Sequence, residues 1–169
     1  MRIPIVNEQD EIIGYKDRKD RNLKDIIRVT GLWVKDKENN MLLAQRAFNK
    51  KHDPGLWGPA VAGTVEEGET YESNIIKEAK EEIGLVGVKF TLGSKSLRHT
   101  SHRYFAQRFT AVVDYDYPFL KQNDEVEALR WFSKDEFIAL LKEKPEMFLP
   151  NFKNYQEEVI SFLNNDSQS

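Results

Sequence analysis

The chain has no cysteine and only three histidines among its 169 residues. The absence of cysteine excludes disulfide bonds, thiolate metal sites and cysteine nucleophiles. No apolar run is long enough to cross a membrane, and Met1–Pro4 does not lead into the apolar core of a signal peptide. We therefore expect a cytoplasmic protein without a membrane partner.

Charge of one sign is not in large excess either. Lys and Arg number 25 against 28 Asp and Glu, which gives a formal net charge of −3. This balance gives no electrostatic reason for binding duplex nucleic acid. The hydrophobic content of 40% suits a globular chain, and we expect one domain over residues 1–163 with a disordered polar tail over 164–169. A homodimer is left open.

Turn signals and apolar periodicity predict an α/β fold. We expect strands at 3–6 and 11–15, which form an N-terminal β-hairpin, at 26–34 and 41–46, which form a second hairpin, and at 59–63, 86–97, 102–114 and 127–132. Helices are expected between the caps Thr70 and Gly84, from Lys134 to about Lys144, and over 150–163. These elements predict a mixed β-sheet sandwiched between helices, an α/β/α arrangement.

An apolar stripe predicts how the helix after Thr70 packs. Its members recur every four residues, with one neighbour beside them: Tyr71, Ile75, Ala79, Ile83 and Ile76. We expect this stripe to be buried, which leaves other sides of the helix available for polar residues.

Three glutamates occupy another side of that helix. Successive helical residues rotate by about 100°, so Glu78 and Glu82 lie about 40° apart, and Glu81 lies about 60° to the other side of Glu78. Carboxylates held this close repel one another unless a cation lies among them. An oxygen-only site of this kind suits Mg²⁺ or Mn²⁺, which keep open positions for water and phosphate oxygens.

Plainer interpretations of the same residues are also open. An acidic helical face is usually solvated surface, and Lys77 and Glu81 have the i, i+4 spacing of an ordinary ion pair. The spacing of the whole segment, which runs from a glycine-rich turn at Gly63 into the helix, favours a functional site instead.

The segment from Gly63 to Leu85 resembles the Nudix box. That pattern is Gly, five residues, Glu, seven residues, Arg-Glu, a hydrophobic residue, any residue, Glu-Glu, any residue, Gly and a hydrophobic residue. The residues in register are Gly63, Glu69, Glu78, Ala79, Glu81, Glu82, Gly84 and Leu85. The Asp10–Gly14 hairpin and the Pro54–Trp57 loop are similar to the Nudix branch related in layout to isopentenyl-diphosphate isomerase.

The resemblance implies a Nudix fold and a catalytic function. The expected activity is divalent-metal-dependent hydrolysis of a diphosphate bond in a nucleoside diphosphate derivative, which makes the partner a small-molecule nucleotide. The implied cofactor is Mg²⁺ or Mn²⁺, and the implied metal ligands are Glu78, Glu82, Glu81 and the backbone carbonyl of Gly63. Glycine at position 63 also lets the loop pass close to metal and phosphate.

One box position departs from the pattern, because Lys77 stands where the family has arginine. In the resemblance, that arginine pairs with loop and helix glutamates and holds the first of them in place. We therefore expect Glu69 to position Lys77 rather than to bind metal. Lysine keeps the charge but lacks the planar fork that grips two carboxylate oxygens at once.

Candidate substrate-binding residues also lie outside the box. Arg46 ends a predicted strand and is favoured among the basic residues that could steady phosphates, the others being Lys50, Lys51 and Arg98. The resemblance implies a further carboxylate from a later loop, for which Glu125 and Glu127 are candidates. His99 and His102 are interpreted as surface or substrate-facing residues rather than metal ligands.

Two rival functions belong to other classes. An isopentenyl-diphosphate isomerase would use a cysteine opposite a glutamate in the related enzyme, and this chain has no cysteine. A non-catalytic nucleotide-binding Nudix module typically loses box glutamates, whereas all four remain here. Both rivals are therefore disfavoured against a hydrolase.

Overall fold

The computed structural model describes residues 1–165 apart from the side chain of Lys153. Strand β3 (Ile26–Lys35) is the strand around which its sheet is arranged. It pairs in parallel with β8 (Arg103–Val112) along its whole length, from Ile26 opposite Arg103 to Lys35 opposite Val112. Its other edge pairs with β6 (Val61–Thr64), and β7 (Thr91–His99) extends the sheet beyond β8. Long parallel pairing of this kind requires residues far apart in the sequence and cannot be read from local patterns.

The hairpin predicted at 26–34 and 41–46 exists only at its base. Strand β4 (Met41–Arg46) pairs with β3 at just two positions, Val34 with Leu42 and Lys35 with Met41. Beyond them the two strands diverge, and β4 pairs instead with β9 (Val126–Phe132) and β5 (Trp57–Pro59). The sheet therefore opens between β3 and β4.

The strand predicted at 59–63 is two strands. Residue Ala60 separates β5, which pairs with β4, from β6, which pairs with β3. The chain changes partner here because β3 and β4 have already diverged. This crossing places the glycine-rich turn on the β3 side of the opening.

The expected N-terminal hairpin is present as β1 (Arg2–Val6) and β2 (Ile12–Asp17), and Val6 of β1 also pairs with Ile26 of β3. The hairpin therefore belongs to the same nine-stranded sheet of the described residues. A single domain over residues 1–163 stays a prediction.

Helix α1 (Tyr71–Ile83) has the predicted caps. The Thr70 side chain accepts a hydrogen bond from the Ser73 amide, and Gly84 ends the helix with a φ of 67°. Ile75, Ala79 and Ile83 are fully buried, but Ile76 is 52% exposed. Its place in the buried stripe was wrong, because a residue one step after Ile75 is rotated away from the sheet.

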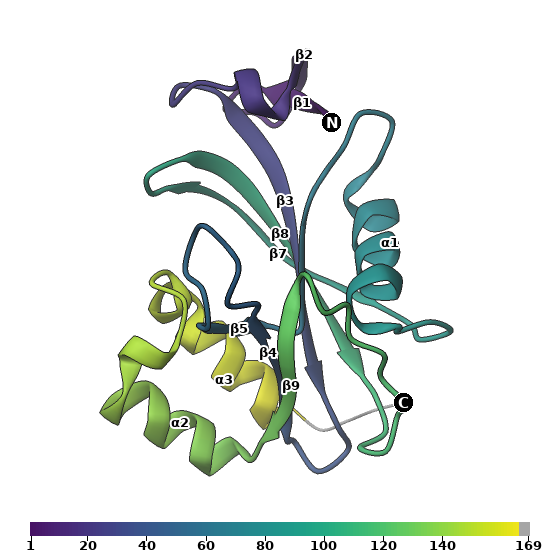
Figure 1. The fold of residues 1–169 in the computed structure, drawn as a ribbon, viewed down its shortest axis with the longest axis vertical. Coiled ribbons are helices and arrows are strands. Elements are labelled where there is room, and N and C mark those ends of the chain that lie inside the picture. The colour runs from purple at the N-terminus through teal and green to yellow at the C-terminus, as the bar shows by residue number, and fades with distance from the viewer. Residues whose placement is uncertain (166–169) are drawn as a thin grey trace.

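The helices cover both faces of the sheet, as Figure 1 shows with α1 on one side and α2 (Lys134–Glu143) and α3 (Gln156–Asn164) on the other. Alternation along β3 explains this division. Leu32 and Val34 pack in the cluster that includes Ile75 of α1, whereas Trp33 packs with Phe137 of α2 and the aromatic residues before α3. The predicted α/β/α fold is confirmed. None of these helices, within residues 1–165, is long and apolar enough to cross a membrane.

The C-terminal helix differs from its prediction at both ends. Residues Phe152–Tyr155 form a 3₁₀ turn with the short-range bond from the Asn154 amide to the Asn151 carbonyl, so α3 begins only at Gln156. At the other end α3 includes Asn164, and buried Lys35 donates to the carbonyls of Phe162 and Asn165 at 2.8 and 2.6 Å. The predicted disordered tail is therefore wrong for Asn164 and Asn165, and 166–169 lie outside the described residues.

Asp10 links the turn of the N-terminal hairpin to three other elements. Its side chain is 7% exposed and accepts hydrogen bonds from Arg28 Nε at 2.7 Å, Lys95 Nζ at 2.8 Å and the Tyr71 hydroxyl at 3.0 Å. Burial alone would raise the pKa of this carboxyl, but the hydrogen bonds from Lys95, Arg28 and Tyr71 outweigh burial and lower it. The ionised carboxylate therefore stabilises the fold.

We predict that Asp10→Asn lowers the free energy of unfolding at pH 7 by about 2–4 kcal/mol, because it leaves the half-buried Arg28 without its counter-charge. Asparagine tolerates the φ of 62° found here, so the change isolates the charge. The folded pKa lies below the ordinary 3.8, so the stabilisation is complete above that value and is lost as the pH falls through the folded pKa.

Urea unfolding of both proteins at pH 7 and at pH 3 measures this difference, which should shrink at the lower pH. Glu8→Gln is the matched control, because Glu8 lies in the same hairpin turn as Asp10, is 66% exposed and makes one ion pair, with Arg103. It should change stability by less than about 1 kcal/mol. An Asp10→Asn protein as stable as wild type at pH 7 would contradict the role assigned to Asp10.

Candidate active site

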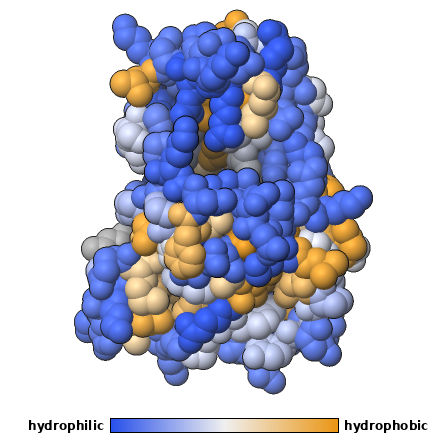
Figure 2. Space-filling view, viewed as in Figure 1, coloured by the Kyte–Doolittle hydropathy of each residue, from blue (hydrophilic) through white to orange (hydrophobic). Residues whose placement is uncertain are grey.

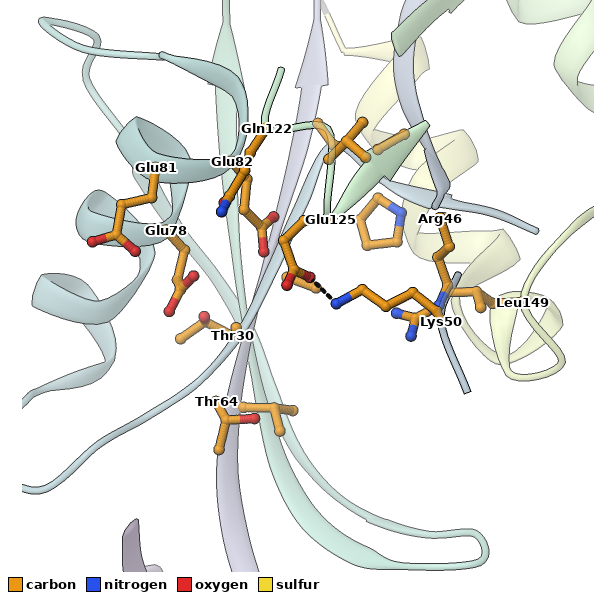
Figure 3. Close-up of a pocket in the computed structure, with 18 of the residues that line it drawn as sticks. Thr30, Arg46, Lys50, Thr64, Glu78, Glu81, Glu82, Gln122, Glu125 and Leu149 are labelled. Atoms are coloured by element: carbon orange, nitrogen blue, oxygen red, sulfur yellow. Dashed lines mark ion pairs between the residues drawn. The ribbon is translucent and has the colours of Figure 1, made fainter. Parts of the chain in front are cut away.

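The divergence of β3 and β4 opens a cavity of about 580 Å³. One wall comes from α1 and β6, and another from the loops around residues 45–50 and 122–126 (Figure 3). The surface view shows a hollow on this side of the molecule, rimmed by hydrophilic residues with hydrophobic atoms deeper inside (Figure 2). The three box glutamates, Glu78, Glu81 and Glu82, all line the cavity.

The carboxylates crowd one another electrostatically. Burial raises the pKa of Glu82 to about 8, the charges of Glu78 and Glu125 add to the rise, and a hydrogen bond with the Ala62 backbone opposes it. Burial also raises the pKa of Glu78, an effect that Lys77 opposes and that Glu81 and Glu69 reinforce. This side of the cavity therefore has an excess of negative charge that a cation would relieve.

The same residues suit a divalent cation by their chemistry. All are hard oxygen donors, and the i, i+3 and i+4 spacing puts them on neighbouring helical positions. Within residues 1–165, however, no three His, Cys, Asp or Glu side chains are already gathered closely enough to hold a metal ion. Figure 3 shows Glu82 directed towards Glu125, while Glu78 and Glu81 extend from the helix in other directions.

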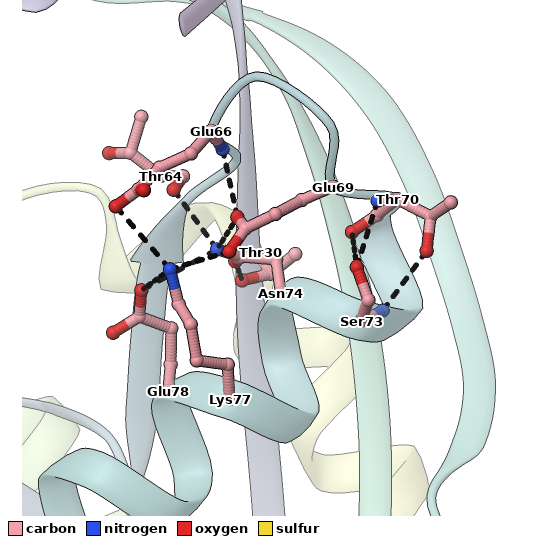
Figure 4. A network of polar contacts seen from close by, with 9 residues as sticks. All are labelled: Thr30, Thr64, Glu66, Glu69, Thr70, Ser73, Asn74, Lys77 and Glu78. Carbon is pink, nitrogen blue, oxygen red and sulfur yellow. Dashed lines mark hydrogen bonds and ion pairs between the residues drawn. The ribbon is translucent and has the colours of Figure 1, made fainter. Parts of the chain in front are cut away.

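Lys77 ties the glycine-rich loop to the helix (Figure 4). Its Nζ lies 2.5 Å from Glu69 Oε1, 3.3 Å from Glu66 Oε1 and 3.6 Å from Glu78 Oε1. Burial alone would lower the pKa of Lys77, but the contacts with Glu69, Glu66 and Glu78 raise it. Burial alone would raise the pKa of Glu69, but hydrogen bonds from Lys77, the Glu66 amide and Asn74 lower it. The i, i+4 ion pair with Glu81, which the sequence left open for Lys77, does not form.

Buried Asn74 was missed by the sequence reasoning. Its amide nitrogen donates to the Thr64 carbonyl at 3.0 Å and to Glu69 Oε2 at 2.9 Å, and its Oδ1 accepts from the Thr30 hydroxyl at 2.6 Å. Asn74 thus connects α1, β3 and the loop through one side chain. The signal was available, since Asn74 precedes Glu78 by four residues and so lies on the glutamate side of the helix.

Gly63 permits the close approach of α1 to β6. A Cβ at this position would lie 2.5 Å from Cγ of Glu78 and 2.8 Å from Oδ1 of Asn74. Any side chain here would therefore displace the side chains of Glu78 and Asn74 from their present positions. The role of the Gly63 carbonyl as a metal ligand stays a prediction.

The other predicted substrate-binding residues divide between the cavity and its surroundings. Arg46, Lys50 and Glu125 line the cavity, and Lys50 forms an ion pair with Glu125. Arg46 is held by a bond of 3.0 Å from its Nε to the His52 carbonyl. Five candidates do not line the cavity: Lys51, Arg98, His99, His102 and Glu127.

A second group missed from the sequence forms the wall farther from α1. It consists of Arg108 on β8 with Trp33, Tyr104, Asn151 and Tyr155. The signal is faint, because polar residues such as Arg108 and its neighbour Gln107 usually lie on the exposed face of a strand, yet both are buried.

Comparisons with known proteins agree with this geometry. The NUDIX domain model matches residues 25–152. The Escherichia coli Nudix hydrolase YfcD is 29% identical over 139 residues, which cover 81% of this chain and 76% of YfcD. An isopentenyl-diphosphate Δ-isomerase from Photobacterium profundum is 23% identical over 96% of both chains. The crystal structure of DR0079 from Deinococcus radiodurans superimposes with a TM-score of 0.77 at 18% identity, covering 99% of this chain and all of DR0079.

The matched residues contain the entire box, α1 and all of the residues that line the cavity except Met1, Arg18 and Tyr155. A family match over most of the chain, with the box glutamates gathered on one cavity wall, establishes that the protein belongs to the Nudix family.

Proposed function

We propose that this protein hydrolyses a diphosphate bond in a nucleoside diphosphate derivative and requires Mg²⁺ or Mn²⁺. The observation that carries the proposal is the presence of Glu78, Glu81 and Glu82 on one wall of a cavity whose neighbouring wall carries Arg46 and Lys50. The cavity is large enough for a nucleotide-sized ligand. A cytoplasmic location remains part of the proposal.

The chain's own residues have distinct tasks in this mechanism. Glu78, Glu81, Glu82 and the Gly63 carbonyl would hold the cation, which when bound neutralises phosphate charge and lowers the pKa of water. Arg46 and Lys50 bind the phosphate oxygens and orient the diphosphate for in-line attack. Lys50 exchanges its ion pair with Glu125 for the substrate, and the freed Glu125 carboxylate accepts the proton of the attacking water.

Lys77 is a positioning residue in this scheme. It contacts Glu78 directly, and it fixes Glu69, whose second oxygen is held by Asn74 and by the Glu66 amide. The pairing keeps the loop that follows Gly63 against the helix and limits the rotamers of Glu78. An isomerase function has less support despite the similarity reported above, because the chain has no cysteine.

We predict that hydrolysis disappears with a chelator and returns with Mg²⁺ or Mn²⁺, and that Glu82→Gln lowers kcat by about 100-fold or more, equivalent to about 3 kcal/mol. The assay is phosphate or nucleotide release from a panel of nucleoside di- and triphosphates, ADP-ribose, sugar nucleotides, dinucleotide polyphosphates and isopentenyl diphosphate. At pH 9, above the pKa of about 8, the thermal midpoint of metal-free Glu82→Gln should equal or exceed that of wild type, because the substitution removes one of several crowded negative charges.

Glu72→Gln is the matched control for Glu82→Gln. Glu72 lies in the first turn of the same helix, is exposed and does not line the cavity, so its substitution should leave kcat unchanged. Full activity after thorough metal removal would refute the mechanism. Cleavage of isopentenyl diphosphate alone, without any nucleotide, would refute the substrate class.

A separate prediction concerns Lys77. Lys77→Ala should lower kcat/KM substantially, on the order of tenfold to 100-fold as for other residues that orient metal ligands, whereas Lys77→Arg should equal or exceed wild type because a guanidinium can grip Glu69 and Glu66 together. The apparent Mg²⁺ affinity should fall in Lys77→Ala and recover in Lys77→Arg. A merely structural role would not give that recovery, and an alanine variant as fast as wild type would show that Lys77 orients nothing.

A further inference from the structure

We propose that Arg108 binds a second anionic group of the substrate, a carboxylate or a phosphate located on the organic part and separate from the scissile diphosphate. This inference rests on the proposed function and adds a substrate class to it. The favoured substrates are diphosphate compounds that carry another negative charge at the end distant from the metal.

Arg108 is a buried cation without a counter-ion. Its residue is 6% exposed, it lines the cavity, and its Nε has no hydrogen-bond partner. Within residues 1–165, no carboxylate forms an ion pair with it. Leaving a buried guanidinium without an anionic partner is costly. An anion that enters the cavity would act as the counter-ion of Arg108, and the attraction between the two charges would favour binding.

Aromatic rings hold the guanidinium in a fixed place. Its Cζ lies 4.0 Å from the ring centroid of Tyr155 and 5.6 Å from that of Trp33. A Cβ on Gly31 would overlap Nη1, so the absence of a side chain at position 31 makes the room for the arginine. Contacts with ring faces stabilise the cation but use none of its N–H donors. The planar fork therefore remains available for two oxygens of a ligand.

Neighbouring polar groups extend this subsite. Asn151 Nδ2 donates to the Tyr104 hydroxyl at 3.1 Å, so this amide uses an acceptor position of the hydroxyl and not its proton. Both residues line the cavity beside Arg108. A guanidinium with a hydroxyl donor is a suitable recognition set for a carboxylate or a phosphate.

The register of β3 separates this subsite from the glutamates. Thr30 lies opposite Gly63 and bonds Asn74 of α1, so Thr30 points to the α1 face of the sheet. Gly31 is the next residue and therefore points to the opposite face, where it meets Arg108. A ligand reaching both faces must extend through the opening between β3 and β4, with its diphosphate at one end and its second anion at the other.

Binding measured without turnover tests the proposal. Titration calorimetry in the presence of a chelator would compare UDP-glucose with UDP-glucuronate and NADH with NADPH, pairs that differ by one carboxylate or one phosphate. We expect wild type to bind the more anionic member of at least one pair tenfold or more tightly, and the pair that responds identifies the anion. Arg108→Met should bind both members of that pair equally.

Two further variants control the measurement. Arg98→Met is the matched control, because Arg98 stacks on the same Tyr155 ring at 4.6 Å but does not line the cavity, so the preference should persist. Gly31→Ala keeps the arginine and displaces its flexible end, and it should lose the preference even if Arg108→Met does not fold. Equal affinities in both pairs for wild type, or a preference retained in Gly31→Ala and Arg108→Met, would overturn the proposal.

The test also distinguishes failure of the two proposals. Glu82→Gln should lose hydrolysis and keep the preference for the more anionic ligand. A wild-type protein that shows the preference but hydrolyses no diphosphate refutes the proposed function alone. A protein that hydrolyses diphosphates with no preference at any concentration refutes the assignment of Arg108 alone.

Discussion

The site depends on the early separation of β3 from β4. Two paired positions join these strands, after which β3 continues beside β6 and β8 while β4 continues beside β5 and β9. Continuous pairing would have filled the space with backbone hydrogen bonds and packed side chains. Divergence instead creates the cavity, and it requires the β5–β6 segment to cross from one half of the sheet to the other, which brings Gly63 to the edge of the opening.

Helix α1 takes its position from this edge. Gly63 allows the helix to approach the strand, and Asn74 fixes the approach with bonds to Thr30 and the Thr64 carbonyl. A buried amide with satisfied partners specifies one arrangement more strictly than apolar packing alone. Lys77 then holds the preceding loop through Glu69. The glutamates are thus presented from a helix whose depth, rotation and N-terminal loop are each fixed by a different contact.

Local chemistry explains which parts of this arrangement the sequence could predict. Thr70, Gly84 and the spacing of Ile75, Ala79 and Ile83 determine a helix through nearby residues, and the predicted limits were correct. The parallel pairing of β3 with β8 joins residues more than seventy positions apart, and no local pattern indicates that pairing or the opening beside β4. Arg108 was missed for the same reason: a charged residue in a strand indicates a face exposed to solvent, and no local pattern shows that the segment around Tyr155 and α3 covers the face that carries Arg108.

The alternation of β3 gives the cavity two chemically different ends. Thr30 turns towards α1 and its carboxylates, and Gly31 leaves space on the other face for the guanidinium of Arg108. If the carboxylates and the guanidinium shared one face, they would attract each other and form an ion pair, which would neutralise both charges. The strand itself prevents this, because the backbone of β3 and its partners lies between the two groups. One strand therefore keeps the carboxylates and the guanidinium apart within a single cavity.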